Sequence, residues 1–552
     1  MSASQPGLDG ETAAEQVLAY HARTRHALGR YAAGPETLDW SAQPDPFREF
    51  CGAPRIDLPL GARRLAVRFA DLYRADTVPV QALCLDTVAM LMELSLAISA
   101  WKVFGPDRWA VRCNPSSGNL HPTEAYLICR NVPGLADGVY HYLARSHSLE
   151  QRCRYPRALP AQAELRVGLS SIAWREAWKY GERAFRYCQL DTGHALGALR
   201  YAAACLGWTL TLDADCGSAQ LTHWLGLDRE ADYRGAEREH AELLLGVAAG
   251  GARAATLSSH ASDDPNAWFG QANLLDPQPM YRWPVIDEVA RASRKPPTAP
   301  VVDVGPIPTY APRIGGSDAG AVDLILSRRS AQRFDGAGIQ SRESFFCMLD
   351  ALLPRRTTPW DVWHHEAHVH PVLFVHRVDG LTPGLYVLPR STSAGDSLRA
   401  AMRPEFRWAP VPGCPGHLPL FLLAEAHAGK VARMISCHQA IAADCTFAAA
   451  LLADFDDVVQ SAPWRYRQLH WEAGLLGQVL YLEAEAAGLR GTGIGCFLDD
   501  AFHELLGLSD RQFQSLYHFT VGLPLADTRI TTLPPYPDRI AANDTEEHTH
   551  ET

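Results

Sequence analysis

Short apolar runs and long apolar segments recur along the chain, and each predicts a different kind of element. Residues 123–129 (Thr-Glu-Ala-Tyr-Leu-Ile-Cys) and 371–376 (Pro-Val-Leu-Phe-Val-His) are short, which is typical of buried strands. Residues 193–207 and 474–488 are rich in Ala and Leu on every side, which predicts two long helices that are buried all round. Because helices are predicted to outnumber strands, we expect an α+β layer structure.

Two other segments add to the predicted elements. Residues 88–101 are the most apolar stretch, but Glu93 interrupts them and they are too few for a membrane span, so they predict a buried helix. Ser99 and Lys102 within that helix match an S-x-x-K motif; without its partner motifs, a structural role is expected. Ser341 precedes another helical segment and predicts its N-cap.

The chain contains an internal repeat. An ungapped offset of 281 residues aligns the two Ala/Leu-rich segments and then aligns Trp224-Leu-Gly-Leu227 with Leu505-Leu-Gly-Leu508. Earlier in the chain, an offset of 246 aligns residues 133–140 with 379–386. Helix-plus-glycine patterns also recur in Ala-rich proteins, but two blocks that match in the same order favour a duplicated unit.

The repeat and a Pro-rich region predict the domain organisation. We expect an N-terminal extension over residues 1–39, a first domain over 40–265 and a second domain over 318–535. Residues 266–317 between them predict an extended connector, and residues 536–552 predict a disordered tail.

Composition then narrows the functional classes. The net charge of −11 over 552 residues argues against a nucleic-acid-binding protein, and the hydrophobic share of 47% is globular. The 13 cysteines form no CxxC pair, so neither a zinc ribbon nor a disulfide framework is expected. Free thiols and a polar N-terminus without a signal-peptide pattern predict a cytoplasmic protein with no membrane segment.

The first candidate for chemistry is Arg328-Arg329-Ser330-Ala-Gln-Arg333, which follows a helical run. Guanidinium groups make forked, charge-assisted hydrogen bonds to phosphate, and a serine hydroxyl adds another donor. A solvated basic end of a helix, stabilised by the helix dipole, would explain the same residues.

Two loops are candidates for contact with a planar ligand. Residues 114–122 (Asn-Pro-Ser-Ser-Gly-Asn-Leu-His-Pro) offer hydroxyl, amide and backbone donors, although turns use the same residue types. Residues 491–497 (Gly-Thr-Gly-Ile-Gly-Cys-Phe) follow a helix and lack the third glycine of a dinucleotide fingerprint, so a Rossmann site is rejected. These glycines would instead let backbone N–H groups approach a ligand closely.

A fourth segment, residues 178–187, contains Lys179 beside Tyr180. A neighbouring ammonium group can lower the pKa of a phenol and make it a usable general acid or base. A loop tyrosine beside a surface lysine would explain the pair equally well.

Two weaker signals remain. His364, His365, His368 and His370 are metal-ligand types, but they lead directly into a predicted strand, so we expect a strand edge and no metal site. Residues 436–439 (Ser-Cys-His-Gln) precede a helix and are a candidate for the wall of a substrate pocket.

Together these motifs resemble the flavin-dependent nitroreductase superfamily, and within it the SagB-type dehydrogenases, the azoline oxidases of peptide natural-product pathways. The resemblance covers residues 15–535 and includes the segments 20–26 and 38–40. It implies two tandem nitroreductase-like α/β/α domains that form an intrachain pseudo-dimer around FMN. It also implies a small-molecule or modified-peptide substrate, and a chain that is a monomer or a higher homo-oligomer.

The resemblance assigns a role to each motif. The implied contacts to phosphate and ribityl come from Arg328, Arg329, Ser330 and Arg333, with Arg529 as a further phosphate candidate. The implied contacts to the flavin ring come from Pro115, Ser116, Ser117, Gly118 and Asn119, and those near N5 from Gly493, Ile494 and Gly495. Lys179 and Tyr180 match the pair regarded as catalytic in azoline oxidases.

The repeat adds an expectation about stoichiometry. Offset 281 pairs Gly493 and Gly495 with Leu212 and Ala214, and offset 246 pairs the serine loop with residues 361–365. Each half has therefore kept a different part of the site, and we expect one FMN per chain. Two alternatives stay open: a nitro- or quinone reductase that uses NAD(P)H as a transient reductant, and a flavin-binding partner of a biosynthetic complex without turnover.

Overall fold

The computed structural model describes residues 12–156, 162–250, 264–298, 310–311, 313, 316–537 and 539. Over these residues it contains 14 α-helices, eight 3₁₀-helices and 19 strands, so helices outnumber strands when the 3₁₀-helices are counted, but α-helices alone do not. Strands such as β16 (Phe447–Asp454, FAAALLAD) are built from the Ala and Leu residues that also favour helices. Their burial in a sheet overrides that local preference.

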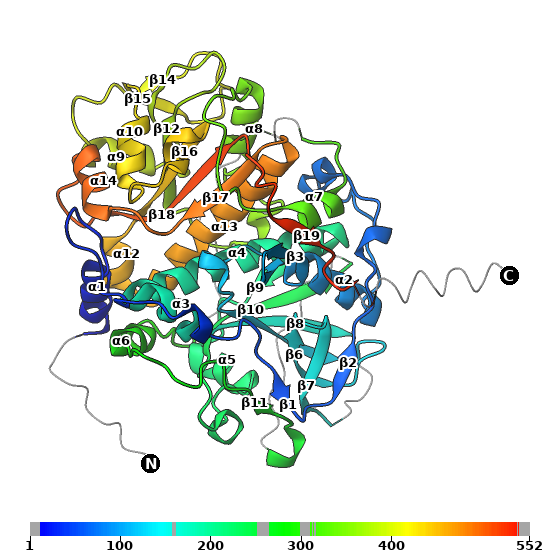
Figure 1. Cartoon of the computed structure of the whole chain (residues 1–552). Helices are drawn as coiled ribbons and strands as arrows, with labels where there is room; N and C mark the ends of the chain where they lie inside the picture. Colours follow the sequence, from blue (N-terminus) through cyan, green and yellow to red (C-terminus); the bar gives the residue numbers. More distant parts are fainter. Residues whose placement is uncertain are drawn as a thin grey trace.

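Two separate seven-stranded antiparallel sheets confirm the α+β fold class (Figure 1). The first sheet has the order β2 (Arg55–Asp57), β7 (Ser148–Arg154), β6 (Gly138–Leu143), β5 (Thr123–Arg130), β8 (Glu164–Ser171), β10 (His240–Ala249), β9 (Trp208–Leu212). The second has the order β14 (Ala409–Pro410), β15 (Phe421–Glu425), β13 (Gly384–Val387), β12 (Val369–Val375), β16, β18 (Phe513–Gly522), β17 (Arg490–Ile494). The predicted strands are β5 and β12, which occupy the same position in the two sheets.

The predicted long helices are α4 (Ala184–Cys205) and α13 (Arg465–Ala486), and both are buried along most of their length. The offset of 281 found in the sequence carries the bounds of α4 directly onto those of α13. The two helices lie between the two sheets (Figure 1). In the part of the chain that the structure describes, no helix is both long enough and apolar enough to cross a membrane.

Helices α4 and α13 cross at a pair of glycines that the repeat also matches. A Cβ on Gly193 would lie 2.2 Å from the carbonyl oxygen of Trp471, and a Cβ on Gly474 would lie 2.2 Å from that of Leu190. Any side chain at either position would therefore push the helices apart. Trp471 Nε1 also donates to Gln189 Oε1 at 2.8 Å across the same contact.

The remaining helices pack against the two long helices, the sheets and one another. They are α1 (Ala13–Arg23), α2 (Leu85–Ser95), α3 (Ala173–Tyr180), α5 (Ser218–Trp224), α6 (Pro284–Ala292), α7 (Ala321–Ser327), α8 (Arg342–Ala351), α9 (Ala394–Ala401), α10 (Gly429–Ile435), α11 (Ile441–Asp444), α12 (Asp456–Ser461) and α14 (Asp499–Leu506). Ser341 caps α8 by accepting a hydrogen bond from Ser344 N–H, which confirms that prediction.

Two sequence predictions need correction at element boundaries. The apolar stretch 88–101 is split between α2 and strand β3 (Ile98–Phe104), so Ser99 and Lys102 lie on a strand. The expected extended connector contains α6, whose apolar face packs against α1. Both errors arise because a continuous apolar pattern does not reveal where a chain turns, and because proline is tolerated at the first turn of a helix.

Each end of the chain packs against the opposite half. Near the N-terminus, His26 N–H donates to the Asp499 carboxylate at 2.9 Å. Near the C-terminus, β19 (Thr531–Leu533) joins β3 and β4 (Asp107–Arg112) in a three-stranded sheet. Tyr536 is buried, donates to Ala144 O at 2.8 Å and accepts from Ile98 N–H. The predicted disordered tail therefore cannot begin as early as residue 536; residues 538 and 540–552 lie outside the described residues.

The glycine crossing generates a stability prediction. Gly193→Ala should lower the free energy of unfolding by at least about 1–3 kcal/mol, because the added methyl group meets a backbone carbonyl that cannot move alone. The matched control is Gly395→Ala, since Gly395 lies in α9 and a Cβ there meets nothing within 4 Å. That variant should gain about 0.5–1 kcal/mol. Urea denaturation of both variants measures the difference, and equal stabilities would contradict this account of the crossing.

Candidate functional site

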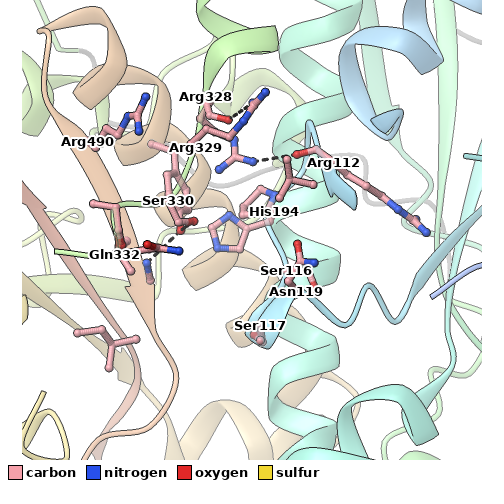
Figure 2. Close-up of a pocket in the computed structure, with 18 of the residues that line it drawn as sticks. Arg112, Ser116, Ser117, Asn119, His194, Arg328, Arg329, Ser330, Gln332 and Arg490 are labelled. Carbon is pink, nitrogen blue, oxygen red and sulfur yellow. Dashed lines mark hydrogen bonds between the residues drawn. The ribbon is translucent and has the colours of Figure 1, made fainter. Parts of the chain in front are cut away.

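A cavity of about 610 Å³ lies between the two halves of the chain. One wall comes from the serine loop before β5 and from α4; the other comes from the segment after α7 and from β17. Figure 2 shows Ser116, Ser117 and Asn119 on one side and Ser330 and Gln332 on the other. The cavity volume falls within the range of about 300–1,000 Å³ that is usual for cofactor and small-molecule sites.

The cavity brings together most of the residues that the sequence singled out. These are Pro115, Ser116, Ser117, Gly118, Asn119, Tyr180, Arg328, Arg329, Ser330, Gly493, Ile494 and Gly495, and Gln439 from the loop that follows α10. Arg333, Arg529 and Lys179 are not among its lining residues. Arg333 is exposed, and Arg529 pairs with the Asp527 carboxylate at 2.6 Å on the surface.

One end of the cavity is strongly cationic. Its lining includes five basic side chains, Lys102, Arg112, Arg328, Arg329 and Arg490. Burial, together with the neighbouring Arg328 charge, lowers the pKa of Arg329 to about 10. Glu485 is the acidic partner nearby, since it accepts from Arg329 N–H at 3.0 Å and lies 3.5 Å from Arg490 Nε. An anionic ligand would relieve the repulsion among these cations.

Arg328 also joins the two halves of the chain. Its Nε and Nη2 donate to the carbonyl oxygens of Cys113 and Arg112, both at 3.0 Å, and its guanidinium lies over the Tyr481 ring. Its Nη1 is buried without a hydrogen-bond partner. A buried guanidinium N–H without an acceptor is unfavourable, so this atom is a donor that suits a bound anion.

The serine loop is held in shape by a buried carboxylate. Ser117 donates to the Asp191 carboxylate through its backbone N–H at 3.1 Å and its hydroxyl at 3.0 Å. Ser116 Oγ accepts from His121 N–H at 2.8 Å. Asn119 adopts a φ of 60° and donates through Nδ2 to Ala110 O at 2.9 Å. The loop therefore has a defined backbone before any ligand binds.

Two buried acidic groups lie behind this loop. Burial raises the pKa of Asp191 to about 7, although the hydrogen bonds from the serines act in the opposite direction. Burial raises the pKa of Glu176 well above its usual range, and the nearby Asp191 carboxyl adds to that effect. Neither oxygen of Glu176 has a hydrogen-bond partner. Below about pH 7 these two groups therefore add little negative charge to this end of the cavity, in contrast to the positive charges at the other end.

Tyr180 and Lys179 end α3, and of the two Tyr180 lines the cavity. A Cβ on Gly118 would lie 2.6 Å from the Tyr180 hydroxyl. Lys179 Nζ lies 5.3 Å from the centres of both the Trp40 ring and the Tyr180 ring. Burial raises the pKa of Tyr180 well above its usual range, so the idea that Lys179 lowers it is wrong. The phenol is a neutral proton donor here.

The glycines at the end of β17 serve the packing of tyrosine rings. A Cβ on Gly493 would lie 1.7 Å from Tyr517 Oη, and a Cβ on Gly495 would lie 1.9 Å from Tyr187 Cε1. The Gly493 N–H donates to Tyr481 Oη at 3.1 Å, so this donor already has a partner. The same hydroxyl lies 2.8 Å from Ser330 Oγ. From the sequence, these glycines are expected to allow a ligand to approach closely. In the structure, tyrosine side chains of the protein itself make the close approach.

The sequence reasoning missed several residues of the cavity wall. They are Arg112, Asp191, His194, Tyr481, Arg490 and Tyr517. Other wall residues lie within motifs that the sequence singled out but were given no role in the site: Lys102, His121, Tyr187, Gln332, Thr492 and Cys496. His194 Nε2 lies 3.0 Å from Tyr517 Oη, while its Nδ1 is buried without a partner. Burial lowers the pKa of His194 to about 3, so the ring is neutral. The sequence signal that could have identified His194 is its position as a polar residue within an otherwise Ala/Leu-rich helix.

The pseudo-equivalent position of the cavity is almost filled. A space of only about 30 Å³ remains there, lined by Leu212, Trp464 and Gln468 among others. Offset 281 pairs these three with Gly493, Arg183 and Tyr187. The connector closes the same region, because Thr298 Oγ1 donates to Ala214 O at 2.7 Å. This space is close to the size of one water molecule.

The histidine run precedes and enters strand β12, as the strand-edge interpretation predicts. His368 and His370 both lie near the Asp454 carboxylate, at 3.4 and 3.3 Å. His365 Nε2 lies 3.2 Å from Gln468 Nε2, in the pseudo-equivalent region. These contacts give the histidines structural partners within the second half.

Comparison with known proteins agrees with this geometry. Residues 419–523 match the nitroreductase family. The crystal structure of a nitroreductase-like protein from Anabaena variabilis superposes with a TM-score of 0.65 over 92% of this chain and 99% of that chain, at 20% sequence identity. The fold is that of the nitroreductases. Because this likeness spans both halves, the nitroreductase fold accounts for the tandem arrangement as well.

Two curated relatives match part of the chain. A nitroreductase-like protein from Methanocaldococcus jannaschii is 31% identical over 129 residues, which cover 21% of this chain and 64% of that protein. The trifolitoxin-processing protein TfxB from Rhizobium leguminosarum bv. trifolii is 26% identical over 193 residues, covering 31% of this chain and 52% of that protein. The chain thus spans less than two thirds of the length of each relative.

The raised pKa of Asp191 generates a prediction about pH. An unfolded aspartate ionises near pH 4, whereas the folded carboxyl holds its proton until about pH 7. Between these values the folded state binds one more proton, so its stability falls as the pH rises. Asp191→Asn removes the titrating carboxyl and with it this pH dependence. From pH 5 to pH 7.5, the wild type should therefore lose roughly 2 kcal/mol more unfolding free energy than the variant, measured by urea denaturation. An equal loss in both proteins would contradict the assignment.

Proposed function

We propose that the chain is an FMN-dependent oxidoreductase of the SagB type, which oxidises a small molecule or a modified peptide. One observation carries the proposal: a cavity assembled by both halves has a cluster of cationic side chains at one end and a tyrosine-lined wall at the other. FMN has the matching chemistry, with a phosphate at one end and a planar ring system at the other. The filled pseudo-equivalent position supports one FMN per chain.

The residues present fit such a ligand. The unpartnered Nη1 of Arg328 and the side chains of Arg329 and Arg490 would hold the phosphate, and Ser330 would hold the ribityl chain. The serine loop, made rigid by Asp191, would lie against the ring system. Bound FMN would supply two-electron redox chemistry.

Tyr180 is the proposed proton-handling group. Of the predicted pair Lys179 and Tyr180, it is Tyr180 that lines the cavity. The raised pKa of its phenol keeps the hydroxyl protonated at neutral pH. A protonated phenol can hold a hydrogen bond to a substrate heteroatom and supply a proton to it. Lys179 would act at most on the position of α3.

The relatives support the direction of the proposal. TfxB is named as a trifolitoxin-processing protein, which favours a modified peptide over a free nitro compound as substrate. The name of the Methanocaldococcus protein favours the reductase alternative. Both matches cover only part of each relative. The identities of the substrate and of the electron acceptor are therefore proposed and are not taken from the relatives.

The first test is flavin content. Purified protein should show a flavin absorption spectrum and release one FMN per chain on denaturation. A stoichiometry of two would contradict the single-site account, and a colourless protein that does not take up added FMN would overturn the proposed function.

Arg490 provides a matched pair of variants for the same measurement. Arg490→Gln should weaken FMN binding by about tenfold or more, because a charge-assisted hydrogen bond to phosphate is lost. Arg333→Gln is the control, since Arg333 is exposed and does not line the cavity. Fluorescence titration of apoprotein with FMN measures both, and equal losses would contradict the location of the phosphate end.

Tyr180→Phe tests the proton-handling role. The variant should keep its FMN but lose about 10²–10⁴-fold in turnover of a synthetic peptide that contains one thiazoline, measured as a mass loss of two hydrogens under air. Lys179→Met should lose less than about tenfold, because the ammonium group lies outside the cavity. A larger effect of Lys179→Met than of Tyr180→Phe would contradict this assignment. Rapid anaerobic bleaching of the flavin by NADPH, without peptide oxidation, would favour the reductase alternative.

A further inference from the structure

Two cysteines that are distant in the sequence meet beside the cavity. Cys437 follows α10, Cys496 follows β17, and their sulfur atoms lie 2.9 Å apart. His26 from the N-terminal region completes the group, with Nδ1 3.9 Å from Cys496 Sγ. Both cysteines are partly buried. Nothing in the proposed flavin chemistry uses this group.

The position of the pair connects it to the cavity. Cys496 lines the cavity directly after Gly495, and its carbonyl oxygen accepts from Gln439 Nε2 at 3.2 Å, where Gln439 is also a lining residue. Arg183 donates to the carbonyl oxygen of Gly495 at 3.2 Å and holds this segment from the first half. Cys496 is therefore placed to exchange electrons directly with a ligand bound in the cavity.

The backbone around Cys437 is held in an unfavourable conformation. Cys437 has a φ of 51° and His438 a φ of 62°, both in the left-handed region that side chains other than glycine and asparagine rarely adopt. Consecutive residues of this kind cost free energy and persist only where surrounding structure imposes them. Here this conformation occurs at the residue whose sulfur lies 2.9 Å from that of Cys496.

The distance between the sulfur atoms favours a redox pair over a metal site. His26, Cys437 and Cys496 are metal-ligand types, and their ligand atoms lie within 4.8 Å of one another. Two thiolates on tetrahedral zinc, with Zn–S bonds of about 2.3 Å, lie about 3.8 Å apart. The observed 2.9 Å is much shorter than that separation, and a disulfide would need the sulfurs to approach to about 2.05 Å.

We propose that Cys437 and Cys496 form a reversible dithiol/disulfide couple that exchanges two electrons with the ligand of the cavity. On oxidation one S–S bond forms and the S–H bond of Cys437 breaks. Two electrons and that proton pass to an oxidised flavin, a step that rests on the proposed function. A small disulfide could serve as the oxidant instead; it would take up a second proton and leave as two thiols.

The local electrostatics suit this exchange. The hydrogen bond shared by the two thiols lowers the pKa of Cys496 to about 5 and raises that of Cys437, and His26 and Arg183 favour the Cys496 thiolate further. One member is thus a thiolate at neutral pH while the other keeps its proton. A thiolate is the reactive form in disulfide exchange.

The first experiment tests the couple without flavin. Apoprotein is equilibrated in buffers of reduced and oxidised glutathione, alkylated, and digested for mass spectrometry. We expect a cross-linked peptide pair containing Cys437 and Cys496 that is two hydrogens lighter than the dithiol and appears in proportion to the oxidised buffer. Cys437→Ser should abolish it, whereas Cys414→Ser, a partly buried cysteine that does not line the cavity, should leave it unchanged.

The second experiment tests the link to the cavity. Anaerobic titration of air-oxidised holoprotein with dithionite should consume about four electrons per flavin, against about two in Cys437→Ser with the flavin spectrum retained. A cross-link that forms in apoprotein while the holoprotein takes up only about two electrons would overturn the exchange with the flavin. Failure to form the cross-link in any buffer, or one tightly bound zinc ion per chain that protects both thiols from alkylation, would overturn the couple itself. A protein that binds no FMN but forms the cross-link would refute the proposed function and leave the couple intact.

Discussion

The close crossing of α4 and α13 is the contact on which the candidate site depends. Gly193 and Gly474 bring the two backbones together, and a single methyl group at either position would meet a carbonyl oxygen. From this fixed point α4 carries Tyr187, Asp191 and His194 to one wall of the cavity, and α13 carries Tyr481 to the other. A close-packed contact of this kind transmits displacement rather than absorbing it. The width of the cavity is therefore set by two glycines that do not line it.

A symmetric scaffold holds an asymmetric site. The repeat gives both halves the same strand order and the same long helix, yet large side chains and the connector occupy the second position. A buried ion pair across the halves, from Arg183 and Arg186 to Asp499, lowers the pKa of that carboxyl well below its usual range. The N-terminal region and β19 each pack on the opposite half. Each of these contacts needs residues from both halves. The two halves therefore pack as one unit around the cavity they share.

The sequence predicted those features that local pattern encodes, and missed those that arise from tertiary contact. An offset of 281 foretold the bounds of α13 from α4, because repeated units keep the same element lengths. The motifs at Ser116 and Ser330 led to the cavity because loops display their polar residues in sequence. Asp191 and His194 were missed because a helix buried all round shows no polar face. Cys437 and Cys496 could not be paired, since 59 residues separate them and only the fold brings them together.

The contrast between the two ends of the cavity gives the site a direction. At one end several guanidinium groups lie close together, and burial together with the neighbouring Arg328 charge lowers the pKa of Arg329 to about 10. At the other end, Asp191 and Glu176 are acidic groups whose raised pKa values keep them close to neutral, so they do not cancel the positive field. A ligand with one anionic end would thus be bound in a single orientation, with its uncharged part against Tyr180 and Cys496. Because protein charges act strongly in a low-dielectric cavity, this orientation precedes any contact with a substrate. On the proposed function, the separation of charge along the cavity, more than any single hydrogen bond, would assign binding to one end and proton and electron transfer to the other.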